Sequence, residues 1–208
     1  MRQFAMVIAV LLTASAIGNC NSAKLVASVK NPSYSGHRFK KVLVIGMSDN
    51  PAIRSDFEDA LANKLTRDEV EAIPGHSILL RPDSANMGLD YLKAQVREHH
   101  IEAVLLTRLV KVEKNITYIP GHSYTVPYPY YNSFYGYYPV AYRQVYSPDY
   151  LREDKTVRIE TNLYATATPE GELVWTGISD TFNPRSAEKA INGVVKVVVK
   201  DLEKEGIF

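Results

Sequence analysis

The stretch FKKVLVIGMSDNPAIRSDFEDALANKL, residues 39–65, decides the fold. Its four consecutive apolar residues at 42–45 are typical of a strand that is covered on both faces. Asp49 and Asn50 are capping candidates, and Pro51 then opens a helix whose apolar residues recur every four positions: Ile53, Phe57, Leu61 and Leu65. On the opposite face of this helix, one turn apart, Arg54 and Glu58 predict a solvent-exposed ion pair.

Further strand and helix patterns follow in alternation. HSILLRP, residues 76–82, predicts a second strand, and residues 101–119 (IEAVLLTRLVKVEKNITYI) predict a third. Between them, residues 84–99 predict a helix with three inward side chains, Leu89, Leu92 and Val96.

The C-terminal part predicts a hairpin and a long helix. Residues 156–182 alternate apolar and polar side chains around a PEG turn at 169–171, and we expect Trp175 in the core. Asn183 is the predicted cap of the last helix, which ends at Gly206, with Ile207 folding back. Its apolar stripe is Ala187, Ile191, Val194, Val195, Val198 and Leu202.

These elements predict one α/β (α+β) domain over residues 39–208. We expect a mixed sheet of about five strands, in the order βαβαβ, insert, ββα, with three packed helices and a tyrosine-rich insert at about 118–155. The polar residues 20–38 are predicted to be a tether with one short edge strand at 25–29.

Residues 1–19 predict an export signal. Arg2 is followed by an apolar run at 4–12 and then by small residues. The apolar run is too short for a permanent membrane helix. The chain's single cysteine, Cys20, follows at once, so that no internal disulfide is possible.

The segment before Cys20 resembles the lipobox of bacterial lipoproteins, in which the cysteine is lipidated and becomes the first residue. Ile17 and Gly18 match it, whereas Asn19 stands where a small residue is usual. Asn21 is not the aspartate that retains lipoproteins at the inner membrane. The resemblance implies an outer-membrane lipoprotein facing the periplasm; the alternative is cleavage after Ala16 or Ala23 and a soluble periplasmic protein.

The composition argues against several function classes. A formal net charge of +1 and the lack of a basic run argue against nucleic acid as a partner. The sequence has no nucleophile elbow, phosphate loop or paired-cysteine metal motif, and neither a cofactor nor a metal is expected. Its acidic cluster on the first helix, Asp56, Glu58 and Asp59, is interpreted as a solvated face, and the neighbours His99 and His100 as a helix end.

A family resemblance rests on residues 39–65, on EAVLLTRLVKVE (102–113) and on ELVWTGISDTF (172–182). These stretches resemble a group of bacterial envelope lipoproteins. That domain is similar in layout to the curli-secretion lipoproteins, to lipoprotein activators of penicillin-binding proteins, and to the amino-terminal domain of the Tol propeller protein. The resemblance implies an envelope adaptor or assembly module rather than an enzyme.

Residues 127–150 of the insert hold nine of the fourteen tyrosines. Tyrosine gives large, rigid contact area with a polar tip, so we interpret the insert as a candidate partner-binding surface. A passive insert stays open, and the prolines at 127, 129, 139 and 148 disfavour a membrane-spanning hairpin. The candidate residues are Tyr128, Tyr130, Tyr131, Phe134, Tyr135, Tyr137, Tyr138, Tyr142 and Tyr146.

The function predicted from the sequence is therefore a non-catalytic envelope lipoprotein, anchored through Cys20, that acts as an adaptor or assembly module. Its expected partner is an envelope protein or a second copy, and a glycan is a further option. One alternative is a homo-oligomeric structural or secretion-apparatus subunit, and another is a cell-wall glycan hydrolase.

Overall fold

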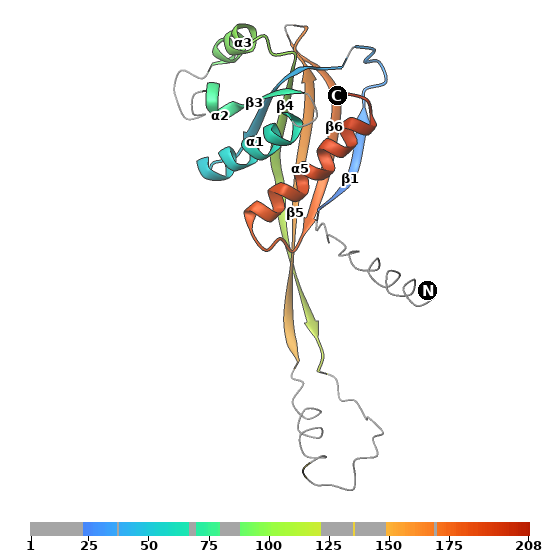
Figure 1. Cartoon of the computed structure of the whole chain (residues 1–208). Helices are drawn as coiled ribbons and strands as arrows, with labels where there is room; N and C mark the ends of the chain where they lie inside the picture. Colours follow the sequence, from blue (N-terminus) through green and yellow to red (C-terminus); the bar gives the residue numbers. More distant parts are fainter. Residues whose placement is uncertain are drawn as a thin grey trace, which may run out of the picture.

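The computed structural model describes residues 23–36, 38–66, 70–79, 88–121, 135, 149–168 and 170–208. It confirms the predicted α/β fold, with a six-stranded mixed sheet in the spatial order β1-β6-β5-β4-β2-β3 (Figure 1). The strands are β1 Ala23–Lys30, β2 Lys41–Met47, β3 Glu71–Pro74, β4 Ala103–Ile119, β5 Tyr150–Ala165 and β6 Glu172–Phe182. The helices are α1 Pro51–Thr66, α2 Gly75–Ile78, α3 Leu89–Glu98 and α5 Ala187–Lys204.

The sheet joins a parallel part to an antiparallel part. β2 lies parallel to both β3 and β4, whereas β4, β5, β6 and β1 pair antiparallel in turn. The predicted edge strand is confirmed as β1, which pairs with β6 from Ala23, opposite Thr181, to Lys30, opposite Trp175. The segment predicted as a tether therefore contributes a strand to the sheet.

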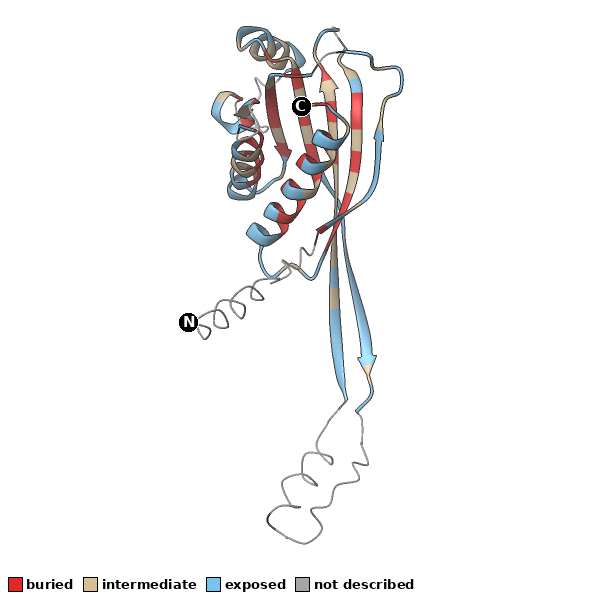
Figure 2. Ribbon diagram, turned by 45° about the vertical axis from the view of Figure 1, so that its right-hand side comes forward, coloured by how far each residue is buried: buried red, intermediate tan, exposed pale blue. Residues whose placement is uncertain are grey.

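The main core lies between the sheet and the helices α1 and α5, which cover the same face (Figure 2). Every second residue of the central strands points into it, among them Val42, Leu105 and Leu163, all fully buried. Trp175 is buried there as predicted, and its Nε1 donates to Asp201 Oδ2 of α5 at 3.1 Å. α1 begins as predicted, since the Asn50 side chain accepts from the backbone N–H of the helix's first turn.

A smaller core lies on the other face, where Leu43, Leu79 and Ile101 pack against Leu92 and Val96 of α3. Leu92 and Val96 thus point inward as predicted. The prediction for Leu89 was wrong, because it lies in the first turn of α3 and is 64% exposed. The segment 84–87 of the predicted helix lies outside the described residues.

The second strand was predicted in the wrong place. The neighbour of β2 on the side away from β4 is β3, and residues 76–78 of the predicted strand belong to the one-turn helix α2. Residues 80–82 of that prediction lie outside the described residues. Gly75 passes so close to Val44 that a Cβ there would lie 2.8 Å from the Val44 carbonyl oxygen. The next backbone N–H, that of His76, donates to Glu58 Oε2, and this bond favours a turn over a continued ladder.

The last helix starts later than predicted. Ser186 is its cap, with Oγ accepting from the Lys189 N–H at 3.1 Å, so Asn183 does not cap it. The predicted end is confirmed, because Gly206 has a φ of 66° and Ile207 is buried. The Ile207 carbonyl accepts from the Phe39 N–H at 3.2 Å and fastens the C-terminus to the start of the domain.

Candidate interaction surface

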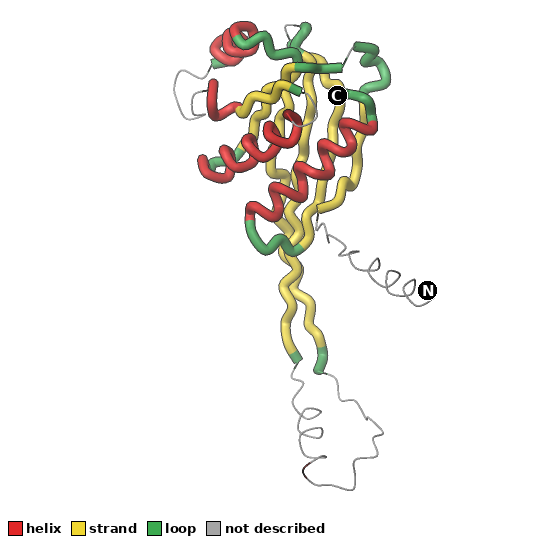
Figure 3. The backbone as a smooth tube through the Cα atoms, viewed as in Figure 1, coloured by secondary structure: helices red, strands yellow, loops and turns green. Residues whose placement is uncertain are grey.

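β4 and β5 run well past the rest of the sheet as a two-stranded arm (Figure 3). The arm comprises residues 111–119 and 150–158, which pair from Lys111, opposite Arg158, to Ile119, opposite Tyr150. Its first three rows still lie beside β6, and the six rows from Lys114, opposite Lys155, to Ile119 are two-stranded. β6 follows β5 only as far as Phe182, opposite Thr156. At about 3.3 Å per residue, the arm extends roughly 20 Å beyond that row.

The two faces of the arm differ in chemistry. The inner face, on the side of the sheet that α1 and α5 cover, carries four cross-strand pairs: Val112 with Val157, Lys114 with Lys155, Ile116 with Glu153, and Tyr118 with Leu151. The outer face carries mainly charged and polar side chains, and only its last pair, Ile119 with Tyr150, is apolar. Figure 2 shows that this ribbon, unlike the body, is mostly exposed.

A β-bulge sets which residues form the inner face. Up to Leu109, the residues of β4 that share a face with the main core are odd-numbered, and Val110 is then an extra residue without a partner on β5. Beyond it the even-numbered residues take that face. The bulge therefore places Val112, Ile116 and Tyr118 in line with the core.

Asn183 fixes the arm where it leaves the body. Its backbone N–H donates to the Lys155 carbonyl at 2.8 Å, and its Oδ1 accepts from the Lys155 N–H at 2.6 Å. Its Nδ2 donates to Asp154 Oδ1 at 2.8 Å, and this hydrogen bond, aided by Arg152, lowers the pKa of Asp154. Asn183 adopts a φ of 44°, which asparagine tolerates better than most residues. The arm is therefore held at a defined angle.

A second brace lies on the outer face, three rows nearer the body. Arg158 donates from Nε and Nη2 to the two carboxylate oxygens of Asp180, both at 2.7 Å. These hydrogen bonds hold the pKa of Asp180 below its usual value, although burial acts in the opposite direction. The pair also offsets the like charges of Lys111 and Arg158, which lie opposite each other, and Lys111 has a further partner in Glu113.

The candidate binding residues predicted from the sequence belong to the segment that connects β4 to β5. Of these, only Tyr135 belongs to the described residues, and it is 85% exposed. The other candidates, Tyr128, Tyr130, Tyr131, Phe134, Tyr137, Tyr138, Tyr142 and Tyr146, lie outside them, as does Cys20. At the last described rows, Tyr118 donates to Asp149 Oδ2 at 2.7 Å, and this bond raises the tyrosine's pKa.

The interpretation of Arg54 and Glu58 as a solvated pair was wrong. They form the predicted ion pair, with Nε 2.9 Å from Oε1, but both side chains are buried. Glu58 also accepts from the backbone N–H groups of Gly46 and His76, and so joins α1 to β2 and α2. Its neighbour Asp59 is half-exposed and pairs with His76 Nε2 at 2.8 Å. The buried Glu58 carboxylate therefore has a structural role.

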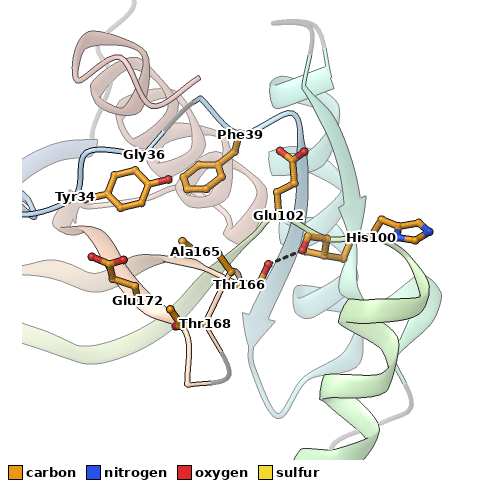
Figure 4. A pocket seen from close by; sticks show the side chains of 11 residues that line it. Tyr34, Gly36, Phe39, His100, Glu102, Ala165, Thr166, Thr168 and Glu172 are labelled. Atoms are coloured by element: carbon orange, nitrogen blue, oxygen red, sulfur yellow. Dashed lines mark hydrogen bonds between the residues drawn. The ribbon is translucent and has the colours of Figure 1, made fainter.

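A pocket of about 410 Å³ lies at the opposite end of the sheet (Figure 4). Tyr34 and Phe39 stack there with ring centroids 5.7 Å apart, and Figure 4 shows Glu102 and Glu172 at opposite sides of the two rings. Burial, and then the charges of the two glutamates, raise the pKa of Tyr34. Glu102 Oε2 accepts from the Lys40 N–H at 2.7 Å, and Glu172 accepts from Asn31. The carboxylates thus hold the loop before β2 against the sheet.

Other candidate chemistry is sparse in the described part of the chain. No group of three His, Cys, Asp or Glu residues there could hold a metal ion, and His99 and His100 lie at the end of α3. Among the same residues, no helix has the length and apolar character needed to cross a membrane. The arm is consequently the feature that most needs a functional explanation.

Fold and site together define a single-sheet α/β domain that projects a braced two-stranded arm. No protein-family model and no curated protein matches the sequence. Solved structures similar to the chain include the PelC dodecamer from Paraburkholderia phytofirmans, at 13% identity and a TM-score of 0.42, covering 85% of this chain and 94% of that one. The lipoprotein GNA1162 from Neisseria meningitidis is similar at 12% identity and a TM-score of 0.43, covering 79% and 98%.

Proposed function

We propose that this protein is a non-catalytic module of the bacterial cell envelope that holds out its arm, with the tyrosine-rich segment between β4 and β5, to an envelope partner. The single observation that carries the proposal is the arm itself. A ribbon of nine cross-strand pairs, braced at its root by Asn183 and Asp180, keeps its apolar side chains exposed. Exposed apolar surface on a rigid support is typical of an interaction site.

The sequence supports the rest of the proposal. The export signal and Cys20 favour a lipoprotein of the outer membrane, with a soluble periplasmic protein as the alternative. The tyrosines between residues 128 and 146 would supply the contact area for the partner. In an adaptor role, that partner would be another protein of the envelope.

A tip replacement tests this division of labour. Because Ile119 and Tyr150 lie opposite each other, an Asn-Gly turn can replace residues 120–149 and close the arm as a hairpin. We expect the variant to keep its circular dichroism spectrum and thermal midpoint while losing its partner. If the replacement unfolds the domain, the segment is part of the fold and the proposal is wrong.

In-cell photo-crosslinking identifies the partner. A probe amino acid at Tyr135, which is exposed, should give a discrete band with another envelope protein, identified by mass spectrometry. A probe at Asp56, an exposed residue of α1, is the matched control. Crosslinks to copies of the same chain alone would favour the homo-oligomeric alternative, and equal bands from both probes would contradict the proposal.

A further inference from the structure

The inner face of the arm carries exposed apolar side chains that the described part of the fold leaves uncovered. Ile116 and Leu151 are each 68% exposed, and Tyr118 and Val112 are about half exposed beside them. These apolar side chains continue the row of the main core beyond the reach of α1 and α5. They form an apolar strip without a cover among the described residues.

The charges on this strip are unbalanced. Lys114 lies directly opposite Lys155, an arrangement that is unfavourable in isolation. Glu153 pairs with Lys114 at 3.0 Å, whereas Lys155 has no ion pair with any described residue. Two lysines and one glutamate leave one positive charge, so that a surface both apolar and anionic would complement the strip.

The chain's N-terminal side leaves the body at the same place as the arm. Ala23, the first residue of β1, lies opposite Thr181, and Thr181 lies opposite Val157 at the arm's root. Cys20 is three residues earlier and can be no more than about 10 Å from Ala23. The arm extends roughly 23 Å past that row, at about 3.3 Å per residue. A membrane attached through Cys20 is therefore within reach of the arm.

We propose that the inner face of the arm lies on the surface of the lipid bilayer to which the N-terminal segment tethers the domain. This inference rests on the proposed envelope location. Ile116, Leu151 and Val112 enter the boundary between headgroups and acyl chains, and Tyr118 lies at headgroup level, where tyrosine is favoured. Lys114 and Lys155 bury their stems and extend their ammonium groups to anionic headgroups. The membrane thereby orients the arm, and the partner of its tip is one at the membrane surface.

Vesicle co-sedimentation tests the inference. The protein used is the chain from residue 20 onward with the substitution Cys20→Ser, so that no acyl chain contributes to binding. We expect it to sediment with vesicles of equal parts phosphatidylglycerol and phosphatidylcholine, and more weakly with pure phosphatidylcholine. Lys114→Gln and Lys155→Gln should each weaken binding to the anionic vesicles about fivefold, and should leave binding to the neutral ones unchanged.

A matched pair of double variants tests which face binds. Tyr118→Ser with Leu151→Ser removes one tyrosine and one aliphatic side chain from the inner face, and we expect at least about a tenfold loss. Ile119→Ser with Tyr150→Ser removes the same two kinds of side chain from the adjacent row of the outer face and should change binding less than about twofold. Circular dichroism checks that each variant stays folded.

Three results would overturn the inference. The first is a wild-type chain that sediments with neither kind of vesicle, and the second is an equal loss from the two double variants. The third is a dimer in lipid-free sedimentation that only the inner-face variant abolishes, because the strip would then contact a second copy. The Tyr135 crosslinks are independent of these assays: vesicle binding without a protein crosslink would remove the proposed partner and leave the membrane contact standing.

Discussion

Glu58→Gln removes the charge of a carboxylate that three donors share. Glu58 Oε1 accepts from Arg54 Nε and from the Gly46 N–H, both at 2.9 Å, and Oε2 accepts from the His76 N–H. The side chain is fully buried, so water cannot replace a lost partner. Glutamine has nearly the same shape but only one acceptor oxygen.

The expected loss of stability is about 3 kcal/mol. The amide nitrogen must face either Arg54 and Gly46 or His76, and at least one donor is left without an acceptor. A hydrogen bond to a charged group contributes about 1.5 to 3 kcal/mol, and breaking a buried ion pair costs about 3 to 5 kcal/mol. A loss of this size is a large fraction of the roughly 5 to 15 kcal/mol by which a domain is stable.

Urea unfolding followed by far-ultraviolet circular dichroism measures this loss. The matched control is Asp59→Asn on the next residue, where a half-exposed pair with His76 should contribute no more than about 1 kcal/mol. We expect a lower midpoint for Glu58→Gln with an unchanged slope. A loss below about 1 kcal/mol, or one equal to that of the control, would refute the structural role given to Glu58.

Three further predictions concern the arm's root and the core. Asp180→Asn should lower the free energy of unfolding by about 1.5 kcal/mol at neutral pH. Because Arg158 lowers the pKa of Asp180, this difference in stability from wild type should be full above the ordinary aspartate pKa. Urea titrations should show it vanish as the pH falls through the lowered pKa. Asn183→Ala removes two side-chain hydrogen bonds at a left-handed φ and should cost about 2 kcal/mol, with faster amide exchange at Lys155; unchanged exchange would argue against the clamp. Trp175→Phe should lower stability by about 2 kcal/mol through a partly empty core site, and an unchanged thermal midpoint would contradict that.

Strong local patterns made much of the fold predictable. The apolar run at 42–45 predicts β2, and the four-residue apolar period predicts α1. Phe57, Leu61 and Leu65 of that period are buried, whereas Ile53 in the first turn is 39% exposed. The hairpin of β5 and β6 could also be predicted, because apolar and polar side chains alternate along much of β5 and Gly171 allows a φ of 75° at the turn. In these elements local preference and tertiary packing agree.

The errors occurred where a distant residue decides the local structure. The apolar residues after His76 could belong to a strand or a helix, and the turn forms where Gly75 passes Val44 and Glu58 accepts the His76 N–H. The burial of Glu58 likewise depends on donors from β2 and α2. Asparagine often caps helices, but the Asn183 side chain instead accepts a hydrogen bond from the Lys155 N–H of the arm, 28 residues away in the sequence.

The arm was only partly predictable. The long third strand was expected to reach residue 119, but its partner was expected to begin at Thr156, since Tyr150 to Lys155 were assigned to the insert. Their pairing with β4 is visible only in the register of the sheet. The inner-face alternation of Val112, Lys114, Ile116 and Tyr118 was present in the sequence. The extra residue Val110 concealed its continuity with the core.

Deleting Val110 would change the direction of the arm without changing which side chains lie on each of its faces. Deleting this one residue would restore a regular ladder in which Lys111 still pairs with Arg158, so that every side chain beyond it would keep its face. The local bend and extra twist that a bulge gives to a strand would be lost. A deletion of one codon would therefore swing the tip to a new position while the surface of the arm stayed as it is.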